Sequence, residues 1–230
     1  MYNELEDFRV TTHVRHKSVS EAIQQIIGFY PVRVVQHSKK EFFIECTHKA
    51  SLHLKGSIID ETGRPVAYAN VLLLSPSDST VIDGGVSNEA GYFVIPCDMN
   101  PVIVRISYVG YKTIFKHCNN LELGTVRMHP ETQALKGVTI EGQTPILRRE
   151  AGKIVFDTRY IAGAINATDL LRYAPGVMLH DDDISLFGTN GIIFCINNKE
   201  QHIGQKEMLQ ILKSYPASDI EKIEIIQTPG

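Results

Sequence analysis

The sequence predicts a multi-domain fold: a small α+β unit over residues 1–50, a seven-stranded β-sandwich over 51–130, a linker over 131–152 and a second α+β unit over 153–230. Three observations support this division. Apolar residues follow helical spacing near both ends of the chain, but that spacing disappears in the middle. Short β-rich runs between turn-forming residues fill the middle, and a polar stretch follows them.

The first unit is predicted to fold as strand, helix, strand, strand. Apolar residues alternate with polar ones over 8–14, as in a half-buried strand. Ser18 and Glu21 have the spacing of a capping box, in which each side chain satisfies a backbone N–H at the start of a helix. Two strands are expected to follow this helix, over 32–35 and 42–46.

The sandwich prediction depends on seven short runs and on the turns between them. Gly63 and Gly91 stand where turns require a positive φ, and Pro65 fits the entry to an edge strand. Ala69 and Val71 are expected to share one inward face. The predicted strands are 52–59, 66–74, 80–87, 92–95, 102–109, 112–115 and 123–127.

The last unit mixes both periods. Helices are predicted over 167–173, which Pro175 and Gly176 end, and over 205–215. The linker before this unit holds one β-capable run at 137–141. The predicted strands are 177–180, 184–187, 191–196 and 220–227.

Composition and motifs argue against several classes of function. A formal net charge of −3 with mixed signs is unlike a nucleic-acid-binding domain. No nucleophile motif or phosphate-binding loop is present, so we expect no enzyme, no catalytic residue and no cofactor. His180 precedes three consecutive aspartates, which point in different directions. We therefore favour a hairpin loop over a calcium site at 180–183 and expect no bound metal.

Four further features of the sequence lead to expectations about cysteine pairing, aromatic packing, targeting and membrane insertion. Cys97 and Cys118 either pair in an oxidising compartment or stay as buried free thiols, which we favour. Tyr108 and Tyr111 are expected to pack at a sandwich rim rather than form a sugar platform. The N-terminus does not resemble a signal peptide, and no run of about 18 apolar residues predicts a membrane helix.

The middle of the chain resembles the carboxypeptidase regulatory-like (transthyretin-like) domain. The resemblance is carried by 56–71 (GSIIDETGRPVAYANV), 87–93 (SNEAGYF) and 107–112 (SYVGYK). Asn88 stands where that family usually has Asp, and Asn also tolerates a turn. The resemblance implies a non-catalytic β-sandwich.

The end of the chain resembles the plug domain of TonB-dependent outer-membrane receptors, in the Bacteroidetes type. The matching blocks are 169–177 (DLLRYAPGV), 184–188 (ISLFG) and 215–230 (YPASDIEKIEIIQTPG). Asn197 and Asn198 replace the family's usual Asp-Gly, and they are still expected to form a tight hairpin turn. Residues 1–50 are similar to the short domain shared by secretins and TonB-dependent receptors.

Together these resemblances imply the periplasmic N-terminal part of an outer-membrane receptor for nutrient binding and uptake. The implied location is the periplasmic side of the outer membrane. The implied partners are a TonB-type energy-transducing protein, the receptor's own or a cognate barrel, and a periplasmic anti-sigma regulator bound through residues 1–50, which could equally serve as a spacer. No transmembrane barrel is expected in this chain, because 22 strands of about ten residues need about 220 more. The sequence is then a piece of a longer protein or a truncated gene product.

A different class of function stays open: a β-sandwich binding or adhesion module at the cell surface, with no transport role. The transport hypothesis also predicts a partner site. Val138, Thr139, Ile140 and Glu141 lie between sandwich and plug, as a TonB box does, and an extended segment can add a strand to a partner's sheet edge. These four residues could instead form a last strand of the sandwich.

Overall fold

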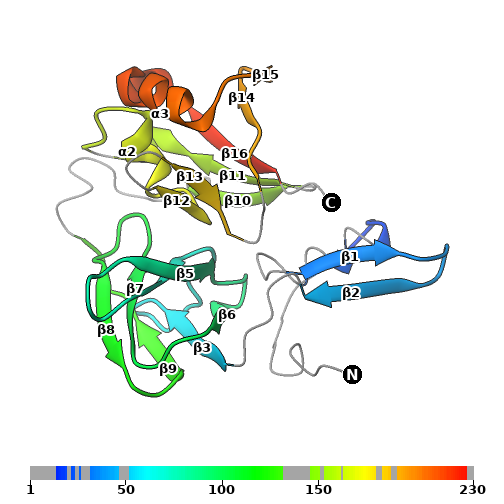
Figure 1. Cartoon of the computed structure of the whole chain (residues 1–230), viewed down its shortest axis with the longest axis vertical. Helices are drawn as coiled ribbons and strands as arrows, with labels where there is room; N and C mark the ends of the chain where they lie inside the picture. The colour runs from blue at the N-terminus through cyan, green and yellow to red at the C-terminus, as the bar shows by residue number, and fades with distance from the viewer. Residues whose placement is uncertain are drawn as a thin grey trace.

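The computed structural model of the chain describes only part of each predicted unit, and these parts are shown in Figure 1. The described residues are 14–19, 22–23, 26, 32–46, 52–131, 146–150, 153–161, 163–179, 183–187 and 191–226.

In the first unit, the described residues fit the predicted helix and hairpin. Ala22 is helical, and its N–H donates to the carbonyl of Ser18 over 2.9 Å. Strands β1 (Val32–Gln36) and β2 (Phe42–Cys46) pair antiparallel, as the sequence predicts. Residues 8–13 of the expected first strand and Glu21 of the capping box lie outside the described residues.

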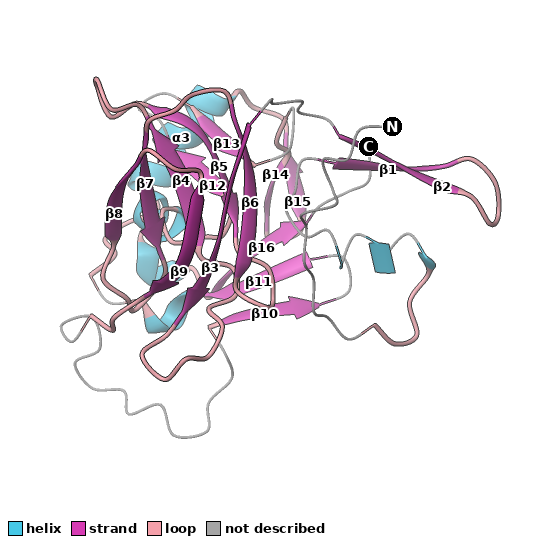
Figure 2. Ribbon diagram, turned by 90° about the horizontal axis from the view of Figure 1, so that it is seen from below, coloured by secondary structure: helices cyan, strands magenta, loops and turns pink. Residues whose placement is uncertain are grey.

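The predicted β-sandwich is confirmed, and Figure 2 shows its strands gathered into one unit. One sheet has the order β6-β3-β9, with β3 and β9 parallel. The other has the order β5-β4-β7-β8 and is antiparallel throughout. The strands are β3 (Leu52–Ile59), β4 (Asn70–Leu74), β5 (Val81–Val86), β6 (Tyr92–Cys97), β7 (Val102–Ser107), β8 (Ile114–Cys118) and β9 (Glu122–Arg127).

The turns of the sandwich explain its exact strand limits. Gly63 and Gly91 have φ of +84° and +74°, as predicted, and a Cβ on Gly91 would lie 2.3 Å from the carbonyl oxygen of Ile58. Tyr68 has a φ of +64°, which no strand accommodates, so the strand expected from residue 66 begins at Asn70 instead. Ala69 and Val71 are fully buried in the sandwich core, as expected.

Asn88 performs the turn role expected of it. Its Oδ1 accepts the backbone N–H groups of Ala90 (2.9 Å) and Tyr92 (3.0 Å).

Cys97 and Cys118 are buried free thiols, so the favoured alternative is confirmed. Tyr108 and Tyr111 pack against the core with ring centroids 5.6 Å apart.

The C-terminal unit contains a three-stranded antiparallel sheet of order β10-β11-β16 with two helices, α2 (Ala167–Leu171) and α3 (Gln205–Ser214). Two short hairpins and two 3-10 helices complete it. These elements are β10 (Leu147–Glu150), β11 (Lys153–Asp157), η1 (Thr158–Tyr160), β12 (Val177–Leu179), β13 (Ile184–Leu186), β14 (Phe194–Ile196), β15 (Lys199–Gln201), η2 (Ala217–Asp219) and β16 (Lys222–Ile226).

The linker expectation over 131–152 needs one correction, because residues 147–150 form β10. Leu147 is buried and pairs with Phe156 across the β10–β11 ladder. Neither β11 nor β15 is among the strands predicted from the sequence. The tight turn expected at Asn197 and Asn198 is confirmed, with φ of +51° and +62°. Within the described part of the chain, no helix is long and apolar enough to span a membrane.

Candidate functional site

The candidate site is the contact between the outer face of the β5-β4-β7-β8 sheet and the C-terminal unit, which lies above the sandwich in Figure 1. Residues alternate between faces along β4, so Val71 and Leu73 enter the sandwich core while Leu72 and Leu74 face outward. The outward residues share one apolar cluster with the C-terminal unit. Its buried members are Tyr68, Leu72, Leu74, Val86 and Val109 from the sandwich, and Leu147, Ile154, Phe156, Ala174, Phe187 and Ile225 from the C-terminal unit.

Asn70 is a polar residue inside this apolar contact, with only 6% of its surface exposed. Its Nδ2 donates to the carbonyl oxygen of Ala174 over 3.2 Å, and its Oδ1 accepts the N–H of Gly176 at 2.8 Å. Gly176 lies in the turn after α2 and has a φ of +79°, a backbone conformation that glycine adopts readily. Because a buried amide is costly unless both its donor and its acceptor are satisfied, these two bonds favour one orientation of the C-terminal unit on β4.

Gly84 lets the two units approach closely. It faces Leu72 across the β4–β5 ladder, and a Cβ at this position would lie 2.4 Å from Cζ of Phe187. Phe187 is 3% exposed and belongs to the shared apolar cluster. A side chain on residue 84 would therefore displace a buried aromatic ring.

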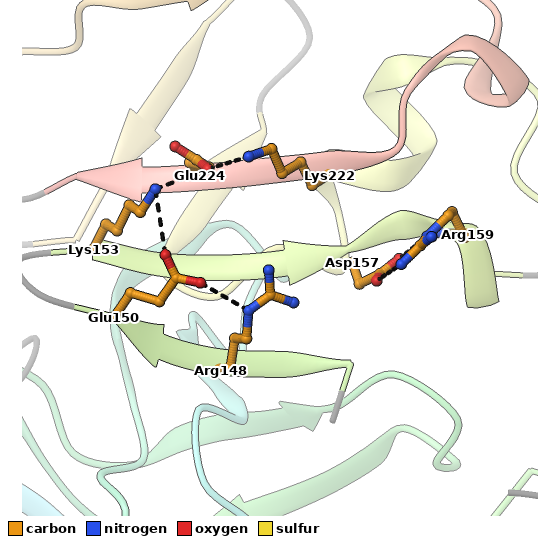
Figure 3. Close-up of polar contacts among 7 residues, drawn as sticks. All are labelled: Arg148, Glu150, Lys153, Asp157, Arg159, Lys222 and Glu224. Carbon is orange, nitrogen blue, oxygen red and sulfur yellow. Dashed lines mark hydrogen bonds and ion pairs between the residues drawn. The ribbon is translucent and has the colours of Figure 1, made fainter. Parts of the chain in front are cut away.

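A ladder of alternating charges crosses the C-terminal sheet (Figure 3). Glu224 of β16 accepts from Lys222 (2.6 Å) and from Lys153 of β11 (2.9 Å). Lys153 also lies 3.4 Å from Glu150 of β10, which accepts from Arg148 over 2.9 Å. This charge ladder joins all three strands of the sheet.

The pKa shifts show what the charge ladder can do chemically. The hydrogen bond from Lys222 lowers the pKa of Glu224, and that from Arg148 lowers the pKa of Glu150. Beside them, the hydrogen bond from Arg159 lowers the pKa of Asp157. Carboxylates held ionised in this way are poor proton donors near neutral pH, so the charge ladder holds strands together and is unsuited to general acid catalysis.

The residues predicted as a partner site, Val138, Thr139, Ile140 and Glu141, lie outside the described residues, so that prediction stays a prediction. Residues 180–182 also lie outside them, while β12 and β13 on either side pair as a hairpin. In the described part of the chain, no group of three or more His, Cys, Asp or Glu side chains could hold a metal ion.

Asn70 lies in one of the family-like motifs without a predicted role, and the roles of Gly84 and Phe187 were not predicted from the sequence. One signal was present. Asn70 interrupts the run Val66–Leu74, which is otherwise mostly apolar, and a polar residue there needs a buried partner.

Comparison with known proteins bears on the sandwich. Residues 53–143 match the family model of the carboxypeptidase regulatory-like domain. Comparison with curated proteins gives no significant match. Among solved structures, a 9R-lipoxygenase from Cyanothece aligns with a TM-score of 0.27 and 13% identity, over 48% of this chain and 20% of that one, a likeness too weak to carry an argument. The chain therefore contains a carboxypeptidase regulatory-like domain within residues 53–143.

Proposed function

We propose that this chain is the periplasmic, plug-bearing N-terminal region of an outer-membrane TonB-dependent receptor and takes part in nutrient binding and uptake. Carboxypeptidase regulatory-like domains are common in such receptors. In this chain the domain is followed by the blocks at 169–177, 184–188 and 215–230, whose sequence and order resemble a receptor plug. The order of the two parts along one chain adds support that neither part gives alone.

The observation that carries the proposal is the contact made by Asn70. A sandwich that only binds a ligand needs no specific tie to the segment after it. Here a buried side chain of the sandwich donates to Ala174 and accepts from Gly176, both within the plug-like block 169–177. A tie of this kind allows an event at the sandwich to act on the plug-like unit, which supports a common role of the two units in one receptor.

The predicted partner segment, Val138–Thr139–Ile140–Glu141, lies in sequence between β9 and β10, the last strand of the sandwich and the first of the C-terminal unit. A TonB-type protein that binds there by strand addition would contact both units from one short segment.

The test is a calorimetric titration of the whole chain with the periplasmic C-terminal domain of the TonB protein from the same bacterium. We expect saturable binding that Val138→Pro abolishes, because proline removes a ladder donor. Gln133→Pro, in the same polar stretch but outside the segment, is the matched control and should bind like the parent chain.

No binding by the parent chain, with a TonB domain that binds another receptor under the same conditions, would overturn the proposal. It would favour the alternative of a binding or adhesion module at the cell surface. The gene itself gives a second, independent test. Alternating strands of about ten residues after Gly230 support the receptor, whereas a stop codon at that point supports the alternative.

A further inference from the structure

Two side-chain nitrogens in the described part of the chain are buried and have no hydrogen-bond partner: Nε2 of His53 and Nε of Arg105. A neutral imidazole can place its proton on the other ring nitrogen, so the cost at His53 is small. A guanidinium is always charged, and its Nε–H can only donate. Arg105 is therefore the group whose situation needs an explanation.

Arg105 lies on β7 at the edge of the contact between the two units. Its cross-strand partners are Leu72 of β4 and Phe115 of β8, so all three point to the outer face of the sheet. Leu72 is covered by the C-terminal unit, whereas Phe115 is 60% exposed. The half-buried guanidinium of Arg105 thus stands where the covered part of this face gives way to solvent.

A second arginine, Arg172 of the C-terminal unit, is near enough for its charge to act on Arg105. Arg172 directly follows α2 and lies two residues before Ala174. The carbonyl of Ala174 accepts from Asn70, which lies two residues before Leu72, the cross-strand partner of Arg105. Burial is the main cause that lowers the pKa of Arg105, and the positive charge of Arg172 is the second. Two like charges therefore act on each other across the contact.

Among the described residues, no carboxylate forms an ion pair within 4.0 Å of either guanidinium. Asp169 lies on α2, just before Arg172. Its carboxylate already accepts the backbone N–H groups of Ile165 (3.0 Å) and Asn166 (3.3 Å). Leaving a half-buried cation without a counter-charge is costly, and placing it beside a second cation increases the cost. A bound anion would remove both costs.

We propose that Arg105 and Arg172 form a binding site for a carboxylate at the edge between the sandwich and the C-terminal unit. The Nε of Arg105 is buried, so a ligand would meet the Nη groups, which are not among the buried unpartnered atoms. The two Nη–H groups of one guanidinium can face the two oxygens of a carboxylate, and the second guanidinium adds charge. The exposed ring of Phe115 offers an apolar surface to the carbon chain that bears the carboxylate. A free small carboxylic acid and an acidic side chain of a partner protein both supply this group. The site does not depend on the proposed transport role.

The test uses the whole chain labelled with ¹⁵N, whose arginine Nε–H signals report directly on guanidinium contacts. We expect the Arg105 signal, assigned by its loss in Arg105→Gln, to move in a saturable way with sodium succinate but not with sodium chloride at equal ionic strength. Arg172→Gln, at an exposed position, should weaken the succinate response at least several-fold and leave the fold intact. Lys116→Gln removes the same charge from the opposite face of β8 and should leave the response unchanged.

A signal that does not move, that moves equally in chloride, or that weakens as much in Lys116→Gln as in Arg172→Gln would overturn the site. A second arm replaces succinate with a short glutamate-containing peptide. Tighter binding of the peptide identifies a partner's side chain as the source of the carboxylate, and tighter binding of succinate identifies a free acid. If Arg105→Gln does not fold, Arg105→Lys, which keeps the charge but has no Nε–H of a guanidinium, assigns the signal instead, and Arg172→Gln then decides the outcome.

Discussion

The side chain of Asn70 accepts a 2.8 Å hydrogen bond from the backbone N–H of Gly176, which lies 106 residues further along the chain. The same side chain donates to Ala174, so one buried amide joins the sandwich to the turn after α2 at two points. Around it the two units share an apolar cluster, which excludes water from both bonds.

Replacing Asn70 with Ala should lower the free energy of unfolding by about 1–3 kcal/mol, because the N–H of Gly176 and the carbonyl of Ala174 are left buried without partners. Asn70→Asp should cost more, since it places a carboxylate oxygen against the carbonyl of Ala174. Chemical denaturation of the whole chain measures both. Asn119→Ala, at an exposed asparagine, is the control and should stay within about 0.5 kcal/mol of the parent. Equal effects at positions 70 and 119 would contradict the role of Asn70.

Gly84→Ala should destabilise the chain by about 1–3 kcal/mol, because the new methyl group meets the buried ring of Phe187. Gly191→Ala is the matched control, since nothing lies within 4 Å of a Cβ at that exposed glycine. Combining Gly84→Ala with Phe187→Leu should cost less than the sum of the two single changes. Additive costs in this double-mutant cycle would show that the two residues do not meet.

Acid should destabilise the C-terminal sheet through the charge ladder. The folded-state pKa values of Glu224 and Glu150 are lowered, so their stabilising contribution is complete above the ordinary glutamate value of about 4.3 and is lost as pH falls below it. Glu224→Gln should therefore lower the Tm at about pH 7, and its Tm should converge with that of the parent toward about pH 3. Glu221→Gln, at a neighbouring exposed carboxylate, should change little at either pH. A Tm difference that grows on acidification would be the wrong sign for this explanation.

Limited proteolysis of the whole chain should cut first between Glu131 and Gly152, as the polar composition of that stretch predicts. The pairing of β10 with β11 narrows the expectation to the bonds before Ile146. Mass spectrometry of the first fragments measures this. Early cuts within 56–115 would argue against separate packing of the sandwich.

The sandwich was predictable because its information is local. Most of its strands contain short apolar runs between turn residues, and Gly63 and Gly91 marked two turns by their chemistry alone. The error at residue 66 came from Tyr68, a residue type that rarely has a positive φ and gives no warning in the sequence.

The contact between the units was not predictable for the opposite reason. Asn70 reads as an ordinary polar residue until Ala174 and Gly176 are brought to it by the fold, more than 100 residues later. In the same way, Arg148 and Glu150 made β10 look like part of a polar linker, because the charge ladder that they join through Lys153 is completed only at Glu224 of β16.

The position of β10 has a mechanical consequence. Among the described strands it has one neighbour, β11, and it is the first described strand after residues 138–141. Force applied to the chain ahead of Ile146 reaches β10 before any other strand of this sheet. Because antiparallel ladder bonds run perpendicular to the strands, force along β10 shears its four residue pairs together, whereas force across it unzips them one by one. β11, held by strands on both sides, yields after β10. A pull from this side is therefore expected to separate β10 before β11, and the direction of loading sets the force at which β10 separates.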